Sequence, residues 1–234
     1  ERILFVKYLN AGQICTSVDH AWLPEASIAA FVEHARQIVP ARYPRLDTPD
    51  YTSIIDEAAF ERLLQALDEA RERGAQVISL LPGPAFDRAT RKIAPHIVLD
   101  APEDSLLLTR EIFGPILPLR GYADLETVIA SINGGPRPLA IYPFSNDART
   151  VQTLIDRVMS GGVSVNDALF HVGQHDLPFG GVGESGMGHY HGVEGFHTFS
   201  KLRPVFYQAR YSPLALLRPP YGRLASRVLA FLTR

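Results

Sequence analysis

The stretch that decides the fold covers residues 56–81 and reads DEAAFERLLQALDEARERGAQVISLL. Its first part has the spacing of an amphipathic helix, with apolar residues on one face at Phe60, Leu63, Leu64, Leu67 and Ala70. Asp56 is a residue type that caps helix starts, and Gly74 is one that ends helices. The apolar run 76–81 then predicts a buried strand. A helix followed closely by a buried strand is typical of α/β proteins.

The same alternation continues on both sides of this stretch. Helical patterns occur at 1–9, 25–39, 124–133 and 147–159. Short apolar strand patterns occur at 18–23, 97–99, 106–109, 116–119, 139–144 and 162–165. We therefore predict an α/β fold with a largely parallel sheet flanked by helices. Functional residues are expected on loops at the strand ends.

Composition narrows the class of protein. Among 234 residues, 46% are hydrophobic and 21% are charged, which is ordinary for a soluble globular chain and argues against disorder. The single cysteine excludes an intramolecular disulfide and favours a reducing, cytoplasmic setting. No apolar run reaches the roughly 18 residues of a membrane span, and the first residues do not resemble a secretory signal.

Charge is unevenly distributed. The net charge is −2, but residues 201–234 contain seven Lys or Arg and no Asp or Glu, so the first 200 residues carry −9. This acidic majority argues against a nucleic-acid partner, because it would repel phosphate.

The only cysteine, Cys15, lies in the small, polar segment 10–17 (NAGQICTS), between a predicted helix and a predicted strand. A cysteine in such a place is a candidate nucleophile, since its thiolate is accessible near neutral pH. Gly12 favours this interpretation by allowing close approach of the backbone. A lone cysteine is more often a small buried hydrophobe, so these residues alone leave the choice open.

Two further segments are candidates for binding. In 111–115 (EIFGP), Glu111 can accept hydrogen bonds from both hydroxyls of a ribose and Phe113 can flank a flat heterocycle; the alternative is a surface glutamate beside a core phenylalanine. In 178–188 (PFGGVGESGMG), the G-x-G-x-x-G pattern lacks the preceding strand and following helix of a dinucleotide fingerprint. We interpret it as a glycine-rich loop packed against a pocket.

Histidine pairs at 171/175 and 189/191 have metal-like spacing but no Cys or carboxylate set beside them, so we predict no metal site. Asn166 and Asp167 follow a predicted strand and either line a pocket or form a turn.

In order, segments 8–15 (YLNAGQIC), 111–115 (EIFGP) and 179–181 (FGG) resemble the aldehyde dehydrogenase superfamily over essentially the whole chain, from Tyr8 to about Gln208. Further segments are most similar to its class 3 and coniferyl aldehyde dehydrogenase branch: 139–142 (LAIY), 160–163 (SGGV), 166–167 (ND), 183–188 (GESGMG) and 190–192 (YHG).

The resemblance implies a role for each candidate. Cys15 would attack an aldehyde, aromatic or medium-to-long aliphatic, to form a thiohemiacetal; hydride transfer to NAD or NADP would leave a thioester that water hydrolyses to the acid. The Cys15 N–H would donate to the oxyanion. Glu111 and Phe113 would bind the cofactor, and Phe179 and Asn166 would lie in the substrate pocket.

The chain departs from the family pattern at its start. In the family, the general-base glutamate lies a few tens of residues before the cysteine, and an asparagine donor and most of the cofactor domain lie further upstream. This chain begins 14 residues before Cys15. We expect it to be a truncated form that does not oxidise aldehydes alone. Two alternatives are a thiol hydrolase pairing Cys15 with a histidine, and a catalytically silent chain that only associates.

The resemblance also divides the chain. Residues 1–197 would form the catalytic domain, 198–208 a strand used in homodimer assembly, and 209–234 a basic amphipathic tail with a helix at 222–234. Docking on an acidic protein surface is the favoured interpretation of the tail, and contact with a membrane surface is the alternative.

Overall fold

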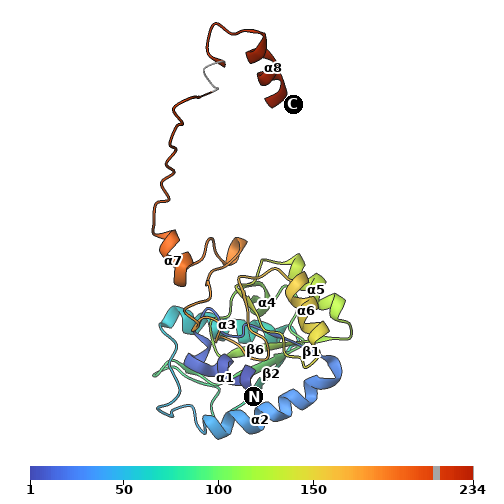
Figure 1. Cartoon of the computed structure of the whole chain (residues 1–234). Helices are drawn as coiled ribbons and strands as arrows, with labels where there is room; N and C mark the ends of the chain where they lie inside the picture. Colours follow the sequence, from blue (N-terminus) through green and yellow to red (C-terminus); the bar gives the residue numbers. More distant parts are fainter. Residues whose placement is uncertain (213–216, 234) are drawn as a thin grey trace. The chain divides into compact units, whose positions relative to one another are not determined.

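The computed structural model describes residues 1–212 and 217–233 (Figure 1). The chain divides into two compact units, 1–198 and 199–234, and each is described by itself.

The main sheet of the first unit has four strands, β1 (Ala21–Pro24), β2 (Gln76–Ser79), β5 (His96–Leu99) and β6 (Ile116–Tyr122), in the order β1-β6-β5-β2. β6 pairs in parallel with both β1 and β5, and β2 joins the edge antiparallel to β5. The central strands β5 and β6 are almost entirely buried at their starts, as expected for strands covered on both faces. The predicted α/β fold with a largely parallel sheet is confirmed.

The longest helix, α3 (Glu57–Glu72), forms as its sequence pattern predicts. The Asp56 carboxylate accepts a hydrogen bond from the Ala59 amide and so satisfies one free N–H of the first turn. Gly74, with φ +91°, lets the chain leave the helix. The apolar stripe from Phe60 to Ala70 is buried against the sheet core.

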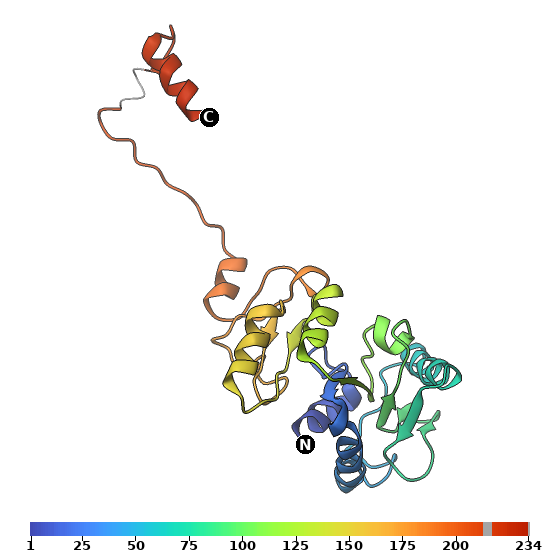
Figure 2. The same ribbon diagram turned by 90° about the vertical axis from the view of Figure 1, so that its right-hand side faces the viewer.

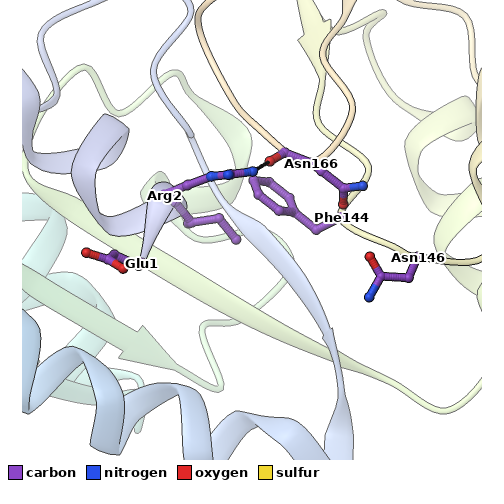
Figure 3. A pocket seen from close by; sticks show the side chains of 6 residues that line it. Glu1, Arg2, Phe144, Asn146 and Asn166 are labelled. Carbon is purple, nitrogen blue, oxygen red and sulfur yellow. Dashed lines mark hydrogen bonds between the residues drawn. The ribbon is translucent and has the colours of Figure 1, made fainter.

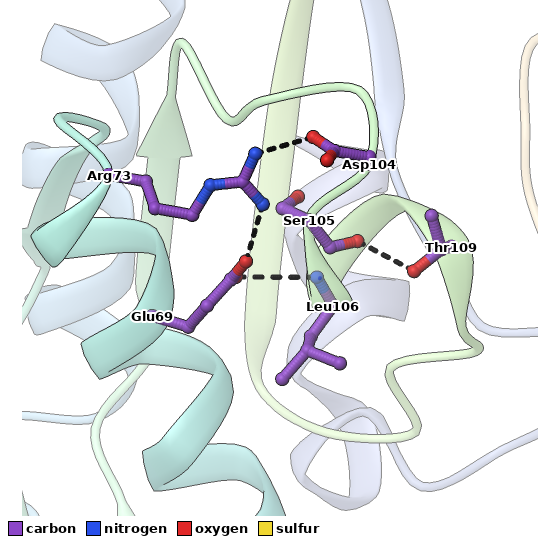
Figure 4. A network of polar contacts seen from close by, with 6 residues as sticks. All are labelled: Glu69, Arg73, Asp104, Ser105, Leu106 and Thr109. Atoms are coloured by element: carbon purple, nitrogen blue, oxygen red, sulfur yellow. Dashed lines mark hydrogen bonds and ion pairs between the residues drawn. The ribbon is translucent and has the colours of Figure 1, made fainter.

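One predicted strand is wrong. Residues 106–109 form a single helical turn, α4 (Leu106–Thr109), because the chain there closes on Ser105: the amides of Leu108 and Thr109 both donate to the Ser105 carbonyl at 3.0 Å. Figure 4 shows the support for this turn, where the Glu69 carboxylate accepts from the Leu106 amide at 3.3 Å and pairs with Arg73. Three consecutive leucines suggested a strand, but only Leu107 is buried.

Smaller elements complete the first unit. Strands β3 (Phe86–Asp87) and β4 (Lys92–Ile93) form an antiparallel hairpin that the sequence did not predict. β7 (Ala140–Ile141) and β8 (Gly162–Val163) pair in parallel and are shorter than predicted. The remaining elements are α1 (Arg2–Tyr8), η1 (Leu9–Gly12), η2 (Glu25–Ser27), α2 (Ile28–Arg42), α5 (Leu125–Gly134), α6 (Ala148–Arg157), η3 (Gly183–Ser185) and α7 (Gly192–Thr198).

Helices α5 and α6 lie side by side, as Figures 1 and 2 both show. Glu126 on α5 forms an ion pair with Arg157 on α6, and the Asn133 side chain donates to the Arg157 carbonyl. The β7–β8 pair belongs to the same part of the chain, between β6 and the glycine-rich loop.

In residues 199–212 and 217–233, which the structure describes of the second unit, there is one α-helix, α8 (Arg223–Leu232), within the tail where a helix was predicted. Residues 199–210 form no strand within the described chain, and Val205, Phe206 and Tyr207 are exposed. Their pairing with a second copy therefore stays a prediction. Among residues 1–212 and 217–233, no helix has the length and apolarity to span a bilayer.

Gly12 lies in close contact with the backbone of a segment that is far away in the sequence. It has φ +76°, and a Cβ built on it would overlap the carbonyl oxygen of Gly114. Asn10 and Ala11 before it also have positive φ, so three successive left-handed residues turn the chain out of α1 onto Gly114. This contact joins the segment that carries Cys15 to the segment that follows Glu111.

We predict that Gly12→Ala costs about 3 kcal/mol or more in free energy of unfolding, because backbone strain and overlap with Gly114 add together. Gly83→Ala is the matched control: Gly83 also has positive φ, +90°, but no atom lies within 4 Å of its added Cβ. This control should lose only about 1 kcal/mol from strain. Equilibrium urea unfolding measures both, and equal losses would contradict the packing role of Gly12.

Candidate active site

Cys15 lies at the tip of a tight turn. The Ser17 amide donates to the Ile14 carbonyl at 2.8 Å, so Cys15 and Thr16 are the two central residues of a β-turn. The Cys15 side chain is exposed, whereas Thr16 is only 2% exposed. A thiol in this position is accessible to a substrate while the backbone that carries it is fixed in the core.

Side chains from distant segments anchor this turn. The Tyr142 hydroxyl donates to the Thr16 carbonyl at 2.7 Å. The Ser17 hydroxyl donates to the Val6 carbonyl on α1 at 3.3 Å. Just before the turn, the side-chain amide of Gln13 donates to the Ser53 carbonyl through its nitrogen and accepts from the backbone N–H of Ile55 through its oxygen. The turn is therefore tied to α1, to the segment before α3 and to the end of β7.

Hydrogen bonds between its backbone and two side chains hold the predicted cofactor segment, 111–115, in place. The Ile112 amide donates to the Asp19 carboxylate at 3.0 Å, and Arg62 on α3 donates to the Ile112 carbonyl at 2.7 Å. Phe113 has φ +45°, an unfavourable conformation that these contacts maintain. The result is a rigid loop on which the Glu111 carboxylate is exposed and the Phe113 ring is half-buried.

Charged groups are concentrated beneath this loop. Lys7 on α1 is only 1% exposed, and its ammonium donates to the Asp19 carbonyl at 3.4 Å. Burial lowers the pKa of Lys7 to about 8, against the attraction of Asp19 and Glu111. Partial loss of water, and then the negative charge of Asp19, raise the pKa of Glu111. Burial also disfavours the charged form of Asp19, but its hydrogen bond from His20 and the charge of Lys7 lower its pKa overall.

Phe179 begins the glycine-rich loop and is held by a short bridge. Its amide and carbonyl pair with the carbonyl and amide of Tyr190 at 2.8 and 2.9 Å. A Cβ on Gly180 or Gly181 would overlap backbone across the loop, which explains why glycine is needed there. The segment 183–185 is a single 3₁₀ turn, with neither the strand nor the helix of a dinucleotide fingerprint, so the rejection of that motif is confirmed.

The Phe179 ring belongs to an aromatic cluster that extends to the turn that carries Cys15. Its centroid lies 6.2 Å from His171, 5.5 Å from Tyr190 and 6.0 Å from His191. His171 in turn lies 6.0 Å from Tyr142, whose hydroxyl binds the Thr16 carbonyl. The structure thus links all three predicted segments: Gly12 connects Cys15 to the Glu111 loop, and Tyr142 connects it to Phe179.

Asn166, the other predicted pocket residue, lies elsewhere. Both ends of its amide bind the backbone of Ser145, at 2.9 and 3.0 Å, and its φ of +57° places it in a turn. It also lines a cavity of about 460 Å³ with Glu1, Arg2, Ile3, Phe144 and Asn146 (Figure 3). Its side chain has a structural task, and contact with a substrate stays a prediction.

The thiol hydrolase alternative requires a histidine hydrogen-bonded to Cys15. Within residues 1–212 and 217–233, no imidazole is hydrogen-bonded to Cys15 Sγ; His171 instead pairs with the Ser164 hydroxyl through Nδ1 at 3.0 Å. The same residues contain no group of three or more His, Cys, Asp or Glu side chains arranged to hold a metal ion. The contact that a Cys–His hydrolase requires is therefore missing from this part of the chain.

Sequence reasoning missed four residues that organise the site: Lys7, Asp19, Arg62 and Tyr142. Two of them carry a signal that could have been noticed. Lys7 is a charge among the apolar residues of α1, and Asp19 follows Cys15 closely at the start of an apolar run. Arg62 and Tyr142 reach the site from distant segments, and nothing in their local pattern shows their partners.

We predict that the contribution of Lys7 to the stability of the folded chain increases as the pH rises from about 8 toward 10.5. The lowered pKa of Lys7 means that the unfolded state binds more protons in this range, so the free energy of unfolding increases with pH. The free energy of unfolding of wild type minus that of Lys7→Met should increase by about 2 kcal/mol between roughly pH 7 and pH 9.5. Urea unfolding at each pH measures it.

Lys201→Met, which removes an exposed lysine, is the control and should follow the wild-type profile. If the stability of Lys7→Met changes with pH in parallel with that of wild type, burial does not lower the pKa of Lys7 in the folded chain.

The chain is similar to known proteins over nearly its whole length. A coniferyl aldehyde dehydrogenase from a Pseudomonas species is 44% identical over 236 residues, which cover 99% of this chain and 49% of that protein. A substrate-bound AldH structure from Staphylococcus aureus superposes with a TM-score of 0.79 and 31% identity, covering 99% of this chain and 50% of that one. An NAD-dependent aldehyde dehydrogenase structure from Sinorhizobium meliloti has a TM-score of 0.78 at 25% identity, covering 91% and 42%.

The chain spans about half the length of the curated relatives it matches. The similarity therefore extends along this chain and does not include the other half of those proteins. Because the model of the aldehyde dehydrogenase family also matches residues 1–205, and the fold agrees, the chain belongs to the aldehyde dehydrogenase family.

Proposed function

We propose that this chain is the cysteine-bearing part of an NAD(P)-dependent aldehyde dehydrogenase in which Cys15 is the nucleophile. The observation that carries the proposal is the position of Cys15: an exposed thiol on a turn that contacts the Glu111 loop through Gly12 and the Phe179 cluster through Tyr142. One local structure thus connects a nucleophile, a candidate cofactor contact and a candidate pocket wall.

The proposed chemistry follows from the thiol. The Cys15 thiolate attacks the aldehyde carbon, a C–S bond forms, and the carbonyl oxygen becomes an oxyanion. The backbone N–H of Cys15 donates to that oxygen. Loss of hydride from the same carbon converts the adduct into a thioester, and water then cleaves the C–S bond to release the acid and the thiol.

The residues around Glu111 are suited to hold the cofactor. A carboxylate accepts hydrogen bonds from ribose hydroxyls, and Glu111 presents one at the surface of a loop that Asp19 and Arg62 keep rigid. Phe113 offers an apolar surface beside it. NAD(P), when bound, supplies the hydride acceptor. The NAD-dependent relative from Sinorhizobium meliloti supports this choice of cofactor.

An aromatic aldehyde is the proposed substrate class. The Pseudomonas relative named for coniferyl aldehyde supports it, and so does the cluster of Phe179, Tyr190 and His171, because aromatic rings pack well against one another. A medium or long aliphatic aldehyde is the alternative.

The proposal requires groups beyond those described. A thiol of this kind needs a general base, and no histidine in residues 1–212 and 217–233 is bonded to Cys15 Sγ. We therefore propose that the base and a second oxyanion donor come from protein equivalent to the other half of the relatives, and that the 234-residue chain alone does not oxidise aldehydes.

A chimera tests this proposal. This chain replaces the corresponding half of the Pseudomonas coniferyl aldehyde dehydrogenase, to which it is 44% identical, and NADH formation from coniferyl aldehyde is followed. The chimera should oxidise the aldehyde, and Cys15→Ser should lower kcat by at least about 10³-fold, because the nucleophile is lost. Glu111→Gln should weaken use of NAD by removing an anionic acceptor.

The isolated chain is measured in parallel and should give no NADH. Oxidation by the isolated chain, or a Cys15→Ser chimera that keeps its activity, would sink the proposal. Lys201→Met in the chimera is the matched surface control and should be as active as the parent chimera.

We also propose a cytoplasmic homodimer in which residues 198–208 pair between copies, with the tail docked on an acidic protein surface. Leu224, Phe231 and Leu232 of α8 are exposed, and Arg223 and Arg227 lie beside them on the same helix, which suits an acidic partner that also offers apolar contacts.

Co-sedimentation with anionic liposomes tests the tail. We expect equal, low binding with and without residues 213–234. Binding that disappears on their removal would instead assign the tail to a membrane surface.

A further inference from the structure

We infer that Tyr142 is a positioning residue for the nucleophile: its hydroxyl holds the Cys15 turn in the geometry needed for attack on a carbonyl. The inference rests on the proposed role of Cys15 as the nucleophile, and it adds a residue that acts on that role through the backbone.

The Thr16–Ser17 peptide group is held at both ends. Its carbonyl accepts the Tyr142 hydroxyl at 2.7 Å, and its N–H donates to the Ile14 carbonyl at 2.8 Å. Two hydrogen bonds on one peptide group polarise and strengthen each other. They fix the plane of the peptide that closes the turn, and with it the direction of the backbone N–H groups at Cys15.

Tyr142 is itself rigidly placed. It directly follows β7, whose Ile141 pairs with Val163 of β8, and the Ser164 amide donates to the Ile141 carbonyl at 3.2 Å. Its ring packs against His171, which the Ser164 hydroxyl holds through Nδ1 at 3.0 Å. Burial raises the pKa of Tyr142 to about 12, so the hydroxyl remains a protonated donor at neutral pH.

The backbone anchor matters because the thiol has little else to place it. In the described residues Cys15 Sγ makes no hydrogen bond, and the side chain is exposed. The position of the sulfur therefore depends on the turn, and the turn depends on Tyr142 and on Ser17, whose hydroxyl donates to the Val6 carbonyl. A small displacement of a nucleophile has a large effect on rate when the reaction has strict geometry.

Two reactions of the same thiol separate positioning from simple exposure. With p-nitrophenyl acetate, the thiolate attacks the acetyl carbon, an oxyanion forms, the C–O bond breaks and p-nitrophenolate leaves; the thiol proton goes to buffer and an acetyl thioester remains. With iodoacetamide, the thiolate displaces iodide directly and no oxyanion forms. Only the first reaction uses a backbone donor aligned with an oxyanion.

The experiment uses the 234-residue chain and compares Tyr142→Phe with Tyr51→Phe. Tyr51 is a matched control, because it is buried and its hydroxyl also donates to a backbone carbonyl, that of Ile93, at 2.7 Å. Each variant loses a hydrogen bond from a tyrosine hydroxyl to a backbone carbonyl, and Tyr142→Phe also loses the one that its hydroxyl accepts from the Leu169 amide. Both losses of stability should be small. Circular dichroism and urea unfolding confirm that both remain folded.

Tyr142→Phe should slow acetylation of Cys15 about tenfold and leave its alkylation by iodoacetamide within about twofold of wild type. Tyr51→Phe should change neither rate. Ser17→Ala, which removes the second anchor of the turn, should show the same divergence between the two reactions and keeps the test decisive if Tyr142→Phe unfolds.

The inference is overturned if the Tyr142→Phe chain is acetylated at the wild-type rate, or if both reactions change in parallel, since that result reports only exposure of the thiol. It is also overturned if wild type releases p-nitrophenolate no faster than Cys15→Ala. None of these measurements uses a cofactor or the other half of the relatives, so failure of the chimera to oxidise aldehydes remains a separate result.

Discussion

The contact between the backbones of Gly12 and Gly114 is the constraint on which the site depends. It brings together the segment before β1, which carries the Cys15 thiol, and the segment before β6, which carries the Glu111 carboxylate. No side chain fits between them, and each segment is strained, with positive φ at Ala11 and at Phe113. Strain of this kind persists only where surrounding contacts exceed its cost. The Asp19 carboxylate and the Arg62 guanidinium provide those contacts.

The elements that could be predicted from sequence are those whose pattern and partners are local. The helix from Glu57 to Glu72 repeats its apolar positions over several turns and carries its own cap, so its limits were clear. The turn at Leu106–Thr109 is too short for a period to appear, and its shape depends on Glu69 and Ser105 instead. The β3–β4 hairpin was missed for the same reason, because two-residue strands leave no alternation to detect.

The candidate site shows the same division. Cys15, Glu111 and Phe179 lie in distinctive segments and could be named in advance, but the contacts that hold them could not. Tyr142 and Thr16 are 126 residues apart in the sequence, and only three-dimensional packing brings them into contact. Asn166 was expected either to line a pocket or to form a turn; its side-chain amide binds the backbone of Ser145 in a turn, and contact with a substrate stays a prediction. Local chemistry identifies candidates, and long-range packing assigns their tasks.

The exposed thiol at the tip of the turn also affects how the purified protein responds to air. Because Cys15 is the single cysteine, oxidation in air has two outcomes: stepwise addition of oxygen to the sulfur, or a disulfide to another molecule. A covalent pair formed in this way would join two turns tip to tip and leave neither thiol free. Its band on a non-reducing gel would then report storage conditions rather than the assembly of the native protein.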